Sequence, residues 1–341
     1  MAVITAKSTV IAAKIESTFN VAEVLTNADC LEVKSSSTLD TTLSTVERDV
    51  IRNSMLRLPP IPVRKETSGN LDFELVSESA LSDDLLGDVL WEAGMGVKEA
   101  GGLGTGGFIG YRDKGTTPAD MIYLAGAAET GTATVYLLGG TSTPTKSLTV
   151  KEFVGTNKSM TTTGNVVESI TINLPTADVA SCVFSLSGCG FTANEADNKL
   201  TPTCSNVVPY LGKSAIFKFH GVSVSATDVS VVITNEIFSQ EALNSDGYSS
   251  KTITGKTVTG SFTVMFEDYS MLTKFQNSTD GSLYIQLTQG SNKFAVYIPK
   301  LRLTSFSKAT SDGIYTQSVD FQVLSDCTSG VEPIVIANMT A

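Results

Sequence analysis

The sequence predicts an all-β protein with two similar tandem domains, each a β-sandwich or half-barrel with one short flanking helix. Three observations predict this fold: short alternating apolar and polar stretches recur along the chain, helical patterns are few, and one strand-then-helix pattern occurs twice. Charged residues make up only 17% of the 341 residues and hydrophobic residues 41%. The chain can therefore bury a core of sheets, and long exposed helices are not expected.

Ten stretches alternate between apolar and polar residues, which is the pattern of a strand with one buried and one solvated face. In chain order they are 71–75, 148–150, 170–174, 183–186, 222–224, 262–266, 283–287, 294–298, 301–303 and 319–324. Aromatic residues that recur in this pattern are expected in the core: Phe73, Phe184, Phe262, Phe266, Phe275, Phe294 and Phe321.

Two helices are expected, each directly after a strand. Ser82 can cap a helix over residues 83–91, with Asp83 and Asp84 in its first turn. Its apolar face would consist of Leu85, Leu86, Val89 and Leu90. The second helix follows Asp268 and Tyr269, and its apolar residues are Met271, Leu272 and Phe275.

The strand-then-helix pattern repeats at an offset of 260 − 69 = 191 residues. In the first copy it consists of Gly69, Leu71 and Phe73, followed by Leu85 and Leu86. In the second copy it consists of Gly260, Phe262, Val264 and Phe266, then Met271, Leu272 and Phe275, with Phe321 in the closing strand. An alternating stretch precedes each copy, at 39–46 and 229–238, and three further strands follow each helix. The pattern indicates an internal duplication.

The repeat suggests a division of the chain. An N-terminal arm, 1–35, precedes the first copy, 36–192, which carries a glycine- and threonine-rich insertion at 101–146. This insertion is expected to be a flexible or hairpin-bearing loop. A connection, 193–227, leads to the second copy, 228–328, and a C-terminal segment, 329–341, follows.

The net charge is −11 and no run of lysine or arginine occurs, which argues against tight binding of nucleic acid. An acidic surface could instead line a channel through which DNA slides, because like charges repel within roughly 8–10 Å at physiological salt. No apolar stretch is long enough to span a membrane, and we expect no signal peptide.

Motifs that could carry chemistry have more ordinary interpretations. Gly102, Gly104 and Gly107 have the spacing of a dinucleotide fingerprint, but that motif needs a strand before it and a helix after it, whereas here a helix precedes it. His220 is the only histidine, and a structural or surface role is expected. The carboxylates Asp83, Asp84, Glu267 and Asp268 are expected at helix starts rather than in a catalytic pair.

The five cysteines are Cys30, Cys182, Cys189, Cys204 and Cys327. Their spacing is irregular and lacks the paired pattern that zinc prefers, so reduced thiols are expected. No catalytic, cofactor-binding or metal-binding residue is predicted from the sequence.

The order of the motifs resembles that of the tail tube (major tail) protein family of siphophages, the long-tailed bacteriophages. In the C-terminal half, the resemblance rests on residues 258–268, 272–279, 282–283, 297–301 and 317–326. In the N-terminal half, it rests on residues 69–75, 83–86 and 165–174. Residues 1–35 and 101–146 depart from the family pattern.

The resemblance implies a structural subunit of the virion, without enzymatic activity or cofactor, that is assembled in the host cytoplasm. Strands of neighbouring copies would combine into a β-barrel around an acidic lumen, and stacked rings would conduct viral DNA from capsid to host cell. The implied partners are other copies of the chain, the tape-measure protein and DNA in the lumen, and tail terminator and tail-tip proteins at the ends. No membrane partner is implied.

Two similar domains in one chain would let three chains close a ring with pseudo-sixfold symmetry, with a hexamer as the alternative. The insertion and the N-terminal arm are the expected contacts between rings. Competing functions are another self-assembling virion protein (the inner tube of a contractile tail, or a decoration protein), a carbohydrate-binding or adhesin module, and an enzyme.

Overall fold

The computed structural model describes residues 9–48, 50, 58–77, 84–102, 108–111, 121–123, 132–140, 143–176, 178–202, 207–243, 247–311, 313–325 and 333–340. Strands dominate these residues, and the α-helices among them are two short ones, α1 (Asp88–Met95) and α2 (Ser270–Gln276). The predicted all-β class is confirmed.

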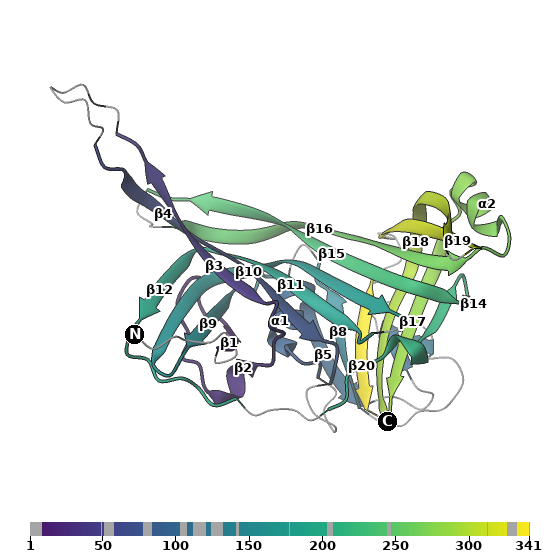
Figure 1. The fold of residues 1–341 in the computed structure, drawn as a ribbon, viewed down its shortest axis with the longest axis horizontal. Helices are drawn as coiled ribbons and strands as arrows, with labels where there is room; N and C mark the ends of the chain where they lie inside the picture. The colour runs from purple at the N-terminus through teal and green to yellow at the C-terminus, as the bar shows by residue number, and fades with distance from the viewer. Residues whose placement is uncertain are drawn as a thin grey trace.

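Eight strands form a continuous antiparallel array, called the long sheet here, across one side of the molecule (Figure 1). Their spatial order is β3 (Thr38–Val46), β4 (Ile61–Glu74), β11 (Ser181–Gly188), β10 (Lys158–Pro175), β15 (Ala226–Glu241), β16 (Tyr248–Met265), β19 (Ile314–Val323) and β18 (Asn292–Ser311). Most of the predicted alternating stretches lie in these strands.

Shorter strands branch from the first halves of β10 and β18. Beside β10 lie β9 (Leu148–Val154), then β1 (Val10–Ile15) and β2 (Cys30–Leu31), with β12 (Gly190–Asn194) on its other side. Beside β18 lie β17 (Gly281–Gln289), β13 (Ile216–Phe219) and β14 (Val222–Ser223). On the other side of β18 lie β20 (Val335–Thr340), β8 (Thr132–Leu138) and β5 (Gly96–Gly102). A separate hairpin joins β6 (Phe108–Tyr111) to β7 (Met121–Tyr123).

The first helix begins later than the sequence predicts. It starts at Asp88 after Gly87, whose φ of 75° is a left-handed conformation that interrupts helical winding. Leu85 and Leu86 precede the helix: Leu85 forms a bridge with Ser77, and the Leu86 N–H donates to the Val76 carbonyl. The expected helix over 83–91 with Leu85 and Leu86 on its face is therefore wrong, while Ser82 and Asp83 lie outside the described residues. The second helix lies where it was predicted.

The N-terminal arm, the insertion within the first copy and the C-terminal segment all contribute strands. In the N-terminal arm, β1 pairs with β9 and buries Ala12 and Ala13. In the insertion, β8 pairs with β5 and buries Tyr136 and Leu137. Of the two expected forms, a flexible loop or a loop with hairpins, this pairing fits the second. In the C-terminal segment, β20 lies between β8 and β18. Deleting residues 101–146 would thus remove a buried strand.

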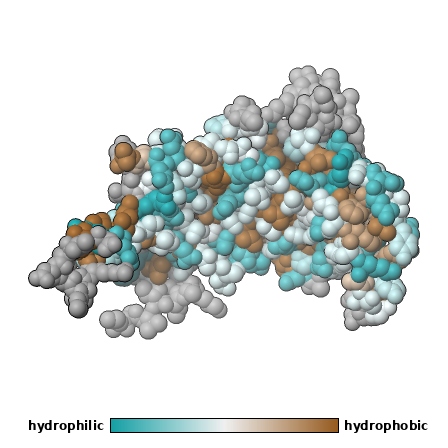
Figure 2. Space-filling model, turned by 90° about the horizontal axis from the view of Figure 1, so that it is seen from above, coloured by the Kyte–Doolittle hydropathy of each residue, from teal (hydrophilic) through white to brown (hydrophobic). Residues whose placement is uncertain are grey.

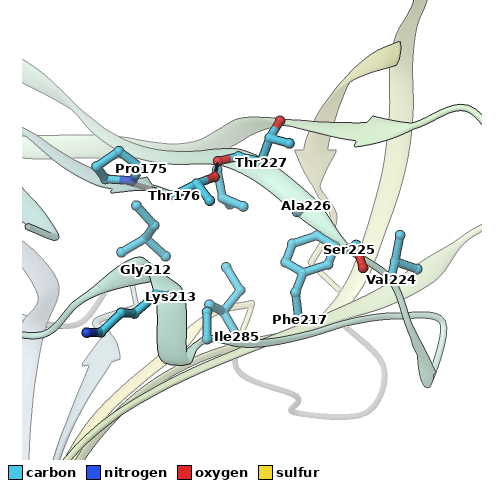
Figure 3. Close-up of a pocket in the computed structure, with 13 residues that line it drawn as sticks. Pro175, Thr176, Gly212, Lys213, Phe217, Val224, Ser225, Ala226, Thr227 and Ile285 are labelled. Atoms are coloured by element: carbon cyan, nitrogen blue, oxygen red, sulfur yellow. Dashed lines mark hydrogen bonds between the residues drawn. The ribbon is translucent and has the colours of Figure 1, made fainter. Parts of the chain in front are cut away.

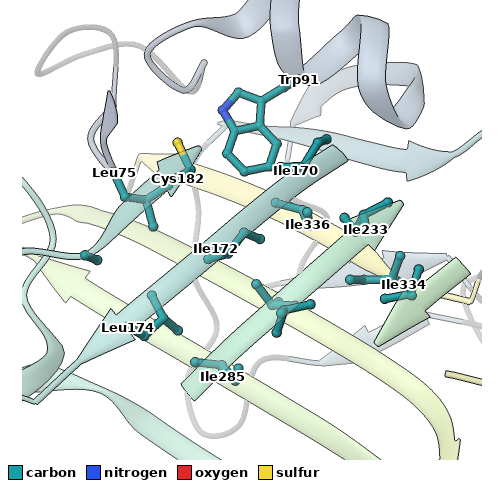
Figure 4. Close-up of a cluster of buried hydrophobic side chains, with 14 of the residues drawn as sticks. Leu75, Trp91, Ile170, Ile172, Leu174, Cys182, Ile233, Ile285, Ile334 and Ile336 are labelled. Atoms are coloured by element: carbon teal, nitrogen blue, oxygen red, sulfur yellow. The ribbon is translucent and has the colours of Figure 1, made fainter. Parts of the chain in front are cut away.

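One large cluster of buried side chains joins both halves of the chain. It includes Trp91 and Ile170 from the first half and Ile233, Ile285 and Ile336 from the second (Figure 4). The indole of Trp91 meets the ring of Phe184 edge-to-face at 5.0 Å between centroids. The division into two tandem domains therefore stays a prediction, because the sheet and this cluster are shared.

The two halves pair their strands in the same order. In the first half the order is β3, β4, β11, β10, β9, and in the second it is β15, β16, β19, β18, β17. The register agrees as well. Gly69 of β4 lies opposite Leu186 of β11, and Gly260 of β16 lies opposite Phe321 of β19. Gly260 is 191 positions after Gly69, and Phe321 is 135 positions after Leu186.

The irregularities of the two arrays coincide too. The β3–β4 ladder shifts between Ser44 and Thr45, and the β15–β16 ladder shifts between Glu236 and Ile237, which lie 192 positions later. The bulge at Glu168 in β10 has its counterpart 136 positions later at Thr304 in β18. A bulge adds an unpaired residue at one point of a ladder. Bulges at matching positions are therefore evidence for the equivalence of the two halves that does not depend on their similar hydrophobic pattern.

Gly69 and Gly260 are places where the partner strand approaches closely. A Cβ on Gly69 would lie 2.8 Å from the Thr38 carbonyl oxygen, and a Cβ on Gly260 would lie 2.5 Å from the Ser230 carbonyl oxygen and against the Phe321 ring. Thr38 and Ser230 occupy equivalent positions in β3 and β15. The repeated glycine is thus explained by the same steric requirement in each half.

Replacing Gly260 with alanine should destabilise the subunit by about 1–3 kcal/mol, because overfilling a packed site forces the backbone or neighbouring rings to shift. Gly69→Ala should cost less, since its nearest neighbours leave more room. Gly140→Ala is the matched control, because a Cβ there meets nothing within 4 Å. Urea unfolding followed by circular dichroism measures all three, and equal stability of Gly260→Ala and Gly140→Ala would contradict the steric argument.

Candidate assembly surfaces

The residues that define the sequence repeat lie mainly in the core. Eight of them are buried: Gly69, Leu71, Phe73, Leu85, Phe262, Val264, Met271 and Phe321. Gly260 is half-buried. Leu86, Phe266, Leu272 and Phe275 are half-buried. The structure brings each set together around its own strand and helix, so these residues support the fold rather than form a chemical site.

The outward face of the long sheet, called the polar face here, is covered by small hydroxyl and amide side chains. Cross-strand registers place them in rows over eight strands, for example Asn70, Ser185, Ser169 and Thr234 on β4, β11, β10 and β15. Figure 2 looks down on the molecule from above, and pale and teal residues cover much of this view with scattered brown ones between them. A sheet face this polar is suited to water rather than to packing against another core.

Side chains on the polar face bond to one another across strands. Ser185 Oγ donates to Asn70 Oδ1 at 2.8 Å, and Ser230 Oγ donates to Asn173 Oδ1 at 3.1 Å. Ser305 Oγ donates to Asp320 Oδ2 at 2.5 Å. These bonds hold the small side chains close to the sheet, so the face is smooth as well as polar.

Charged residues on the polar face are mainly acidic. In the described strands, the register places the carboxylates Asp40, Asp72, Glu74, Asp228 and Asp320 on this face. Arg302 lies on the same face and pairs with Asp280 at 2.7 Å, while Lys34 lies 3.5 Å from Asp72. A polyanion near this surface would meet more negative than positive charge.

Apolar side chains are exposed at opposite ends of the long sheet. The β3–β4 hairpin projects past the rest of the described chain (Figure 1) and exposes Leu43, Val46, Ile61 and Val63. At the other end, near α2, Met265, Tyr269, Ile314 and Tyr315 are exposed. Here the Lys308 ammonium lies 4.0 Å from the ring centre of Tyr315 and 4.2 Å from that of Phe266.

A cavity of about 250 Å³ lies where β10 ends and β15 begins (Figure 3). Pro175, Thr176, Lys213, Phe217 and Thr227 are among the residues that line it. Among the described residues that line it, Lys213 is the only ionisable one. In the same described part of the chain, no group of three or more His, Cys, Asp or Glu could hold a metal ion. The cavity has no arrangement of acid, base and nucleophile that would support catalysis.

Sequence motifs considered for chemistry have structural surroundings. Gly102 ends strand β5, and the next described element, β6, is a strand rather than the helix that a dinucleotide site requires; Gly104 and Gly107 lie outside the described residues. His220, with φ of 51°, and Gly221 form the β13–β14 turn. Burial and the nearby Lys274 lower the pKa of His220, so its imidazole favours the neutral form.

The described cysteines, Cys30, Cys182 and Cys189, are free thiols. Burial raises the pKa of the Cys189 thiol to about 11, and burial also raises that of Cys182. Neither of these two forms an appreciable thiolate at neutral pH, which is the reactive species. Cys204 and Cys327 lie outside the described residues.

The acidic residues near the helices form structural networks. Lys98 Nζ lies 3.0 Å from Asp84 and 2.7 Å from Asp88, and the Tyr136 hydroxyl donates to Asp88 at 2.6 Å. These contacts tie α1 to strands β5 and β8. At the second helix, Asp268 accepts the Ser270 N–H at 2.8 Å, as expected of an acidic residue at a helix start.

Comparison with known proteins identifies one family. The sequence model of the phage tail tube protein family matches residues 6–323, nearly the whole chain. No curated protein matches the chain at a significant level. Among the described helices, neither has the length and apolar character needed to cross a membrane.

Proposed function

Since the chain belongs to the phage tail tube protein family, and is therefore a structural virion subunit that self-assembles into a tube, we propose that three copies close each ring with pseudo-sixfold symmetry. The family is a structural one and not an enzyme family. The observation that carries the ring of three is the agreement in strand order, register and bulges between the two halves of the chain.

This agreement supports an internal duplication, because bulges at matching positions are inherited more readily than they arise twice. Two equivalent units in one chain place six similar units in a closed ring of three chains. The tandem units, 36–192 and 228–328, would then occupy successive places around the ring. A hexameric ring of complete chains is the alternative.

The polar face is the surface that we assign to the lumen. It is broad and smooth, it lacks a core-like apolar patch, and its charges are mainly carboxylates. DNA passing such a wall would meet few cations to hold it and a weak mutual repulsion. The tape-measure protein would occupy the same space before DNA, and tail terminator and tail-tip proteins would contact the two ends of the tube.

The motif order that resembles siphophage proteins favours a long non-contractile tail over the inner tube of a contractile one. The N-terminal arm, 1–35, and the insertion, 101–146, are the candidates for contacts between rings. Assembly in the host cytoplasm and ejection of DNA through the lumen complete the proposed role.

Electron cryomicroscopy of tubes assembled from the purified chain tests the proposal. A ring of three chains of 36.0 kDa each should show an approximate sixfold repeat at low resolution that resolves into threefold symmetry at higher resolution. Six complete chains per ring would contradict the ring of three. A protein that stays monomeric at every concentration would contradict the tube itself.

A further inference from the structure

The outermost strands of the long sheet are β3 on one side and β18 on the other, and each has an edge without a described partner strand. No described strand pairs with β3 on the side away from β4, and over residues 302–311 β18 pairs with β19 alone among the described strands. Exposed strand edges recruit further strands unless something covers them. Among the described residues, both edges are therefore open to pairing with a second chain.

The chain itself contains a template for joining such edges. In the middle of the long sheet, β10 of the first half pairs with β15 of the second, from Ser169 opposite Thr234 to Pro175 opposite Asp228. By the offsets found above, β18 is the equivalent of β10, and β3 is the equivalent of β15. The free edge of β18 therefore corresponds to the edge of β10 that pairs with β15. The free edge of β3 corresponds to the edge of β15 that pairs with β10.

We propose that β18 of one copy pairs antiparallel with β3 of a second copy, in the register of the internal β10–β15 junction. Adding 136 to the β10 positions and subtracting 192 from the β15 positions places Ser305 opposite Thr42 of the second copy. The same shift places Ser307 opposite Asp40, and Ala309 opposite Thr38. The inference rests on the proposed ring and names the strands and the register that close it.

The projecting hairpin fits this arrangement. Internally, the β15–β16 hairpin reaches past β10 and grips α1: Asn235 Nδ2 donates to the Gly94 carbonyl at 3.2 Å, and Lys256 Nζ donates to the Met95 carbonyl at 2.7 Å. The equivalent hairpin positions in β3–β4 are Leu43 and Lys65. When the copies pair, these two residues of the second copy lie over the carboxyl end of α2 of the first copy.

The exposed surfaces agree with that placement. Leu43 is 47% exposed on the hairpin, and pairing the copies would bring it over α2 of the neighbouring copy. Lys65 would add a cation at the negative end of the α2 dipole, as Lys256 does at α1. The occupant of each edge is therefore another copy of this chain.

Disulfide cross-linking tests the register. The double variant Ser307→Cys/Asp40→Cys places thiols on directly opposed residues, whose Cα atoms lie about 4.5–5.5 Å apart in an antiparallel pair. That distance suits a disulfide. Thr171→Cys/Val232→Cys is the internal positive control, because these two residues are opposed within one chain. Ser307→Cys/Ser44→Cys is the shifted control, displaced by about 13 Å along the strand.

On mild oxidation of assembled protein, the in-register variant should convert most of the monomer band to linked chains on non-reducing gels. The shifted variant and each single variant should stay at the level of the unmodified protein, while the internal control should close within one chain. A ladder that ends at three or at six chains supports the register in either case and separates a ring of three from a hexamer.

Two results would overturn the inference. One is assembled protein in which the internal control closes but the in-register variant forms no links between chains. The other is a shifted variant that links as well as the in-register variant. If the unmodified chain never assembles, both the proposed tube and this interface fail, whereas tubes without cross-links refute the interface alone.

Discussion

Replacing Trp91 with alanine should destabilise the folded subunit by about 3–5 kcal/mol, the range for truncating a large buried aromatic side chain. Trp91 is fully buried and packs edge-to-face on Phe184 at 5.0 Å and against Tyr136 at 5.9 Å. It joins α1 to β11 of the long sheet and to β8 of the insertion. Its loss would leave a cavity at the point where these three elements meet.

The Trp91 prediction is measured as the free energy of unfolding in urea, with Trp91→Phe as the matched variant. Phenylalanine keeps an aromatic ring in the site and should lose clearly less stability than alanine. Because Trp91 is the only tryptophan, circular dichroism rather than fluorescence must follow unfolding. Equal losses for the two variants would show that ring packing is not the source of the effect.

The strands were the most predictable part of this fold. Residues 71–75, 170–174 and 262–266 alternate because one side of each strand faces the core and the other side lies on the polar face, where Asp72, Thr171 and Thr263 stand. The repeat was visible for the same reason. Gly69 and Gly260 both lie where the partner strand leaves no room for a side chain, and the apolar residues that follow them have the same spacing. Such local causes leave a mark on the sequence.

Other elements depend on distant partners, and their sequence carries a weaker signal. Leu85 and Leu86 look helical by spacing, yet the Tyr136 hydroxyl takes the Leu85 N–H, and Gly87 stops helical winding. Val10–Ile15 and Val335–Thr340 become strands because β9, β8 and β18 offer them edges. No periodicity within these short segments indicates those partners.

The candidate assembly surfaces were only partly predictable. An acidic, charge-poor composition suggested a surface past which DNA could slide, but it could not place that surface. Placement required the cross-strand registers, which set Ser185, Ser169 and Thr234 in one row on one face. The sequence-based list of repeat residues identified core positions, because conspicuous alternation marks burial rather than contact with another chain.

Removing the Glu16 side chain with Glu16→Ala should cost about 2–6 kcal/mol of stability or release the N-terminal strand locally. Its carboxylate is buried and accepts four hydrogen bonds: from Asn20 N and Ser147 Oγ on one oxygen, and from Thr149 Oγ1 and Gly164 N on the other. Hydroxyl groups can rotate to other acceptors, but the two backbone N–H groups cannot, and each unsatisfied buried donor costs about 1–3 kcal/mol.

Glu16→Gln is the informative comparison, because it keeps one acceptor oxygen and should lose less stability than alanine. Glu23→Ala is the surface control: the Glu23 carboxylate accepts exposed hydrogen bonds from the N–H and the hydroxyl of Ser17. Amide hydrogen exchange resolves the mechanism, since loss of the carboxylate should speed exchange in Val10–Ile15 before it affects β10 and β11. Unchanged exchange in Val10–Ile15, together with unchanged unfolding, would show that the four bonds do not hold the N-terminal strand in the sheet. That strand would then be held by its pairing with β9 and by the burial of Ala12 and Ala13.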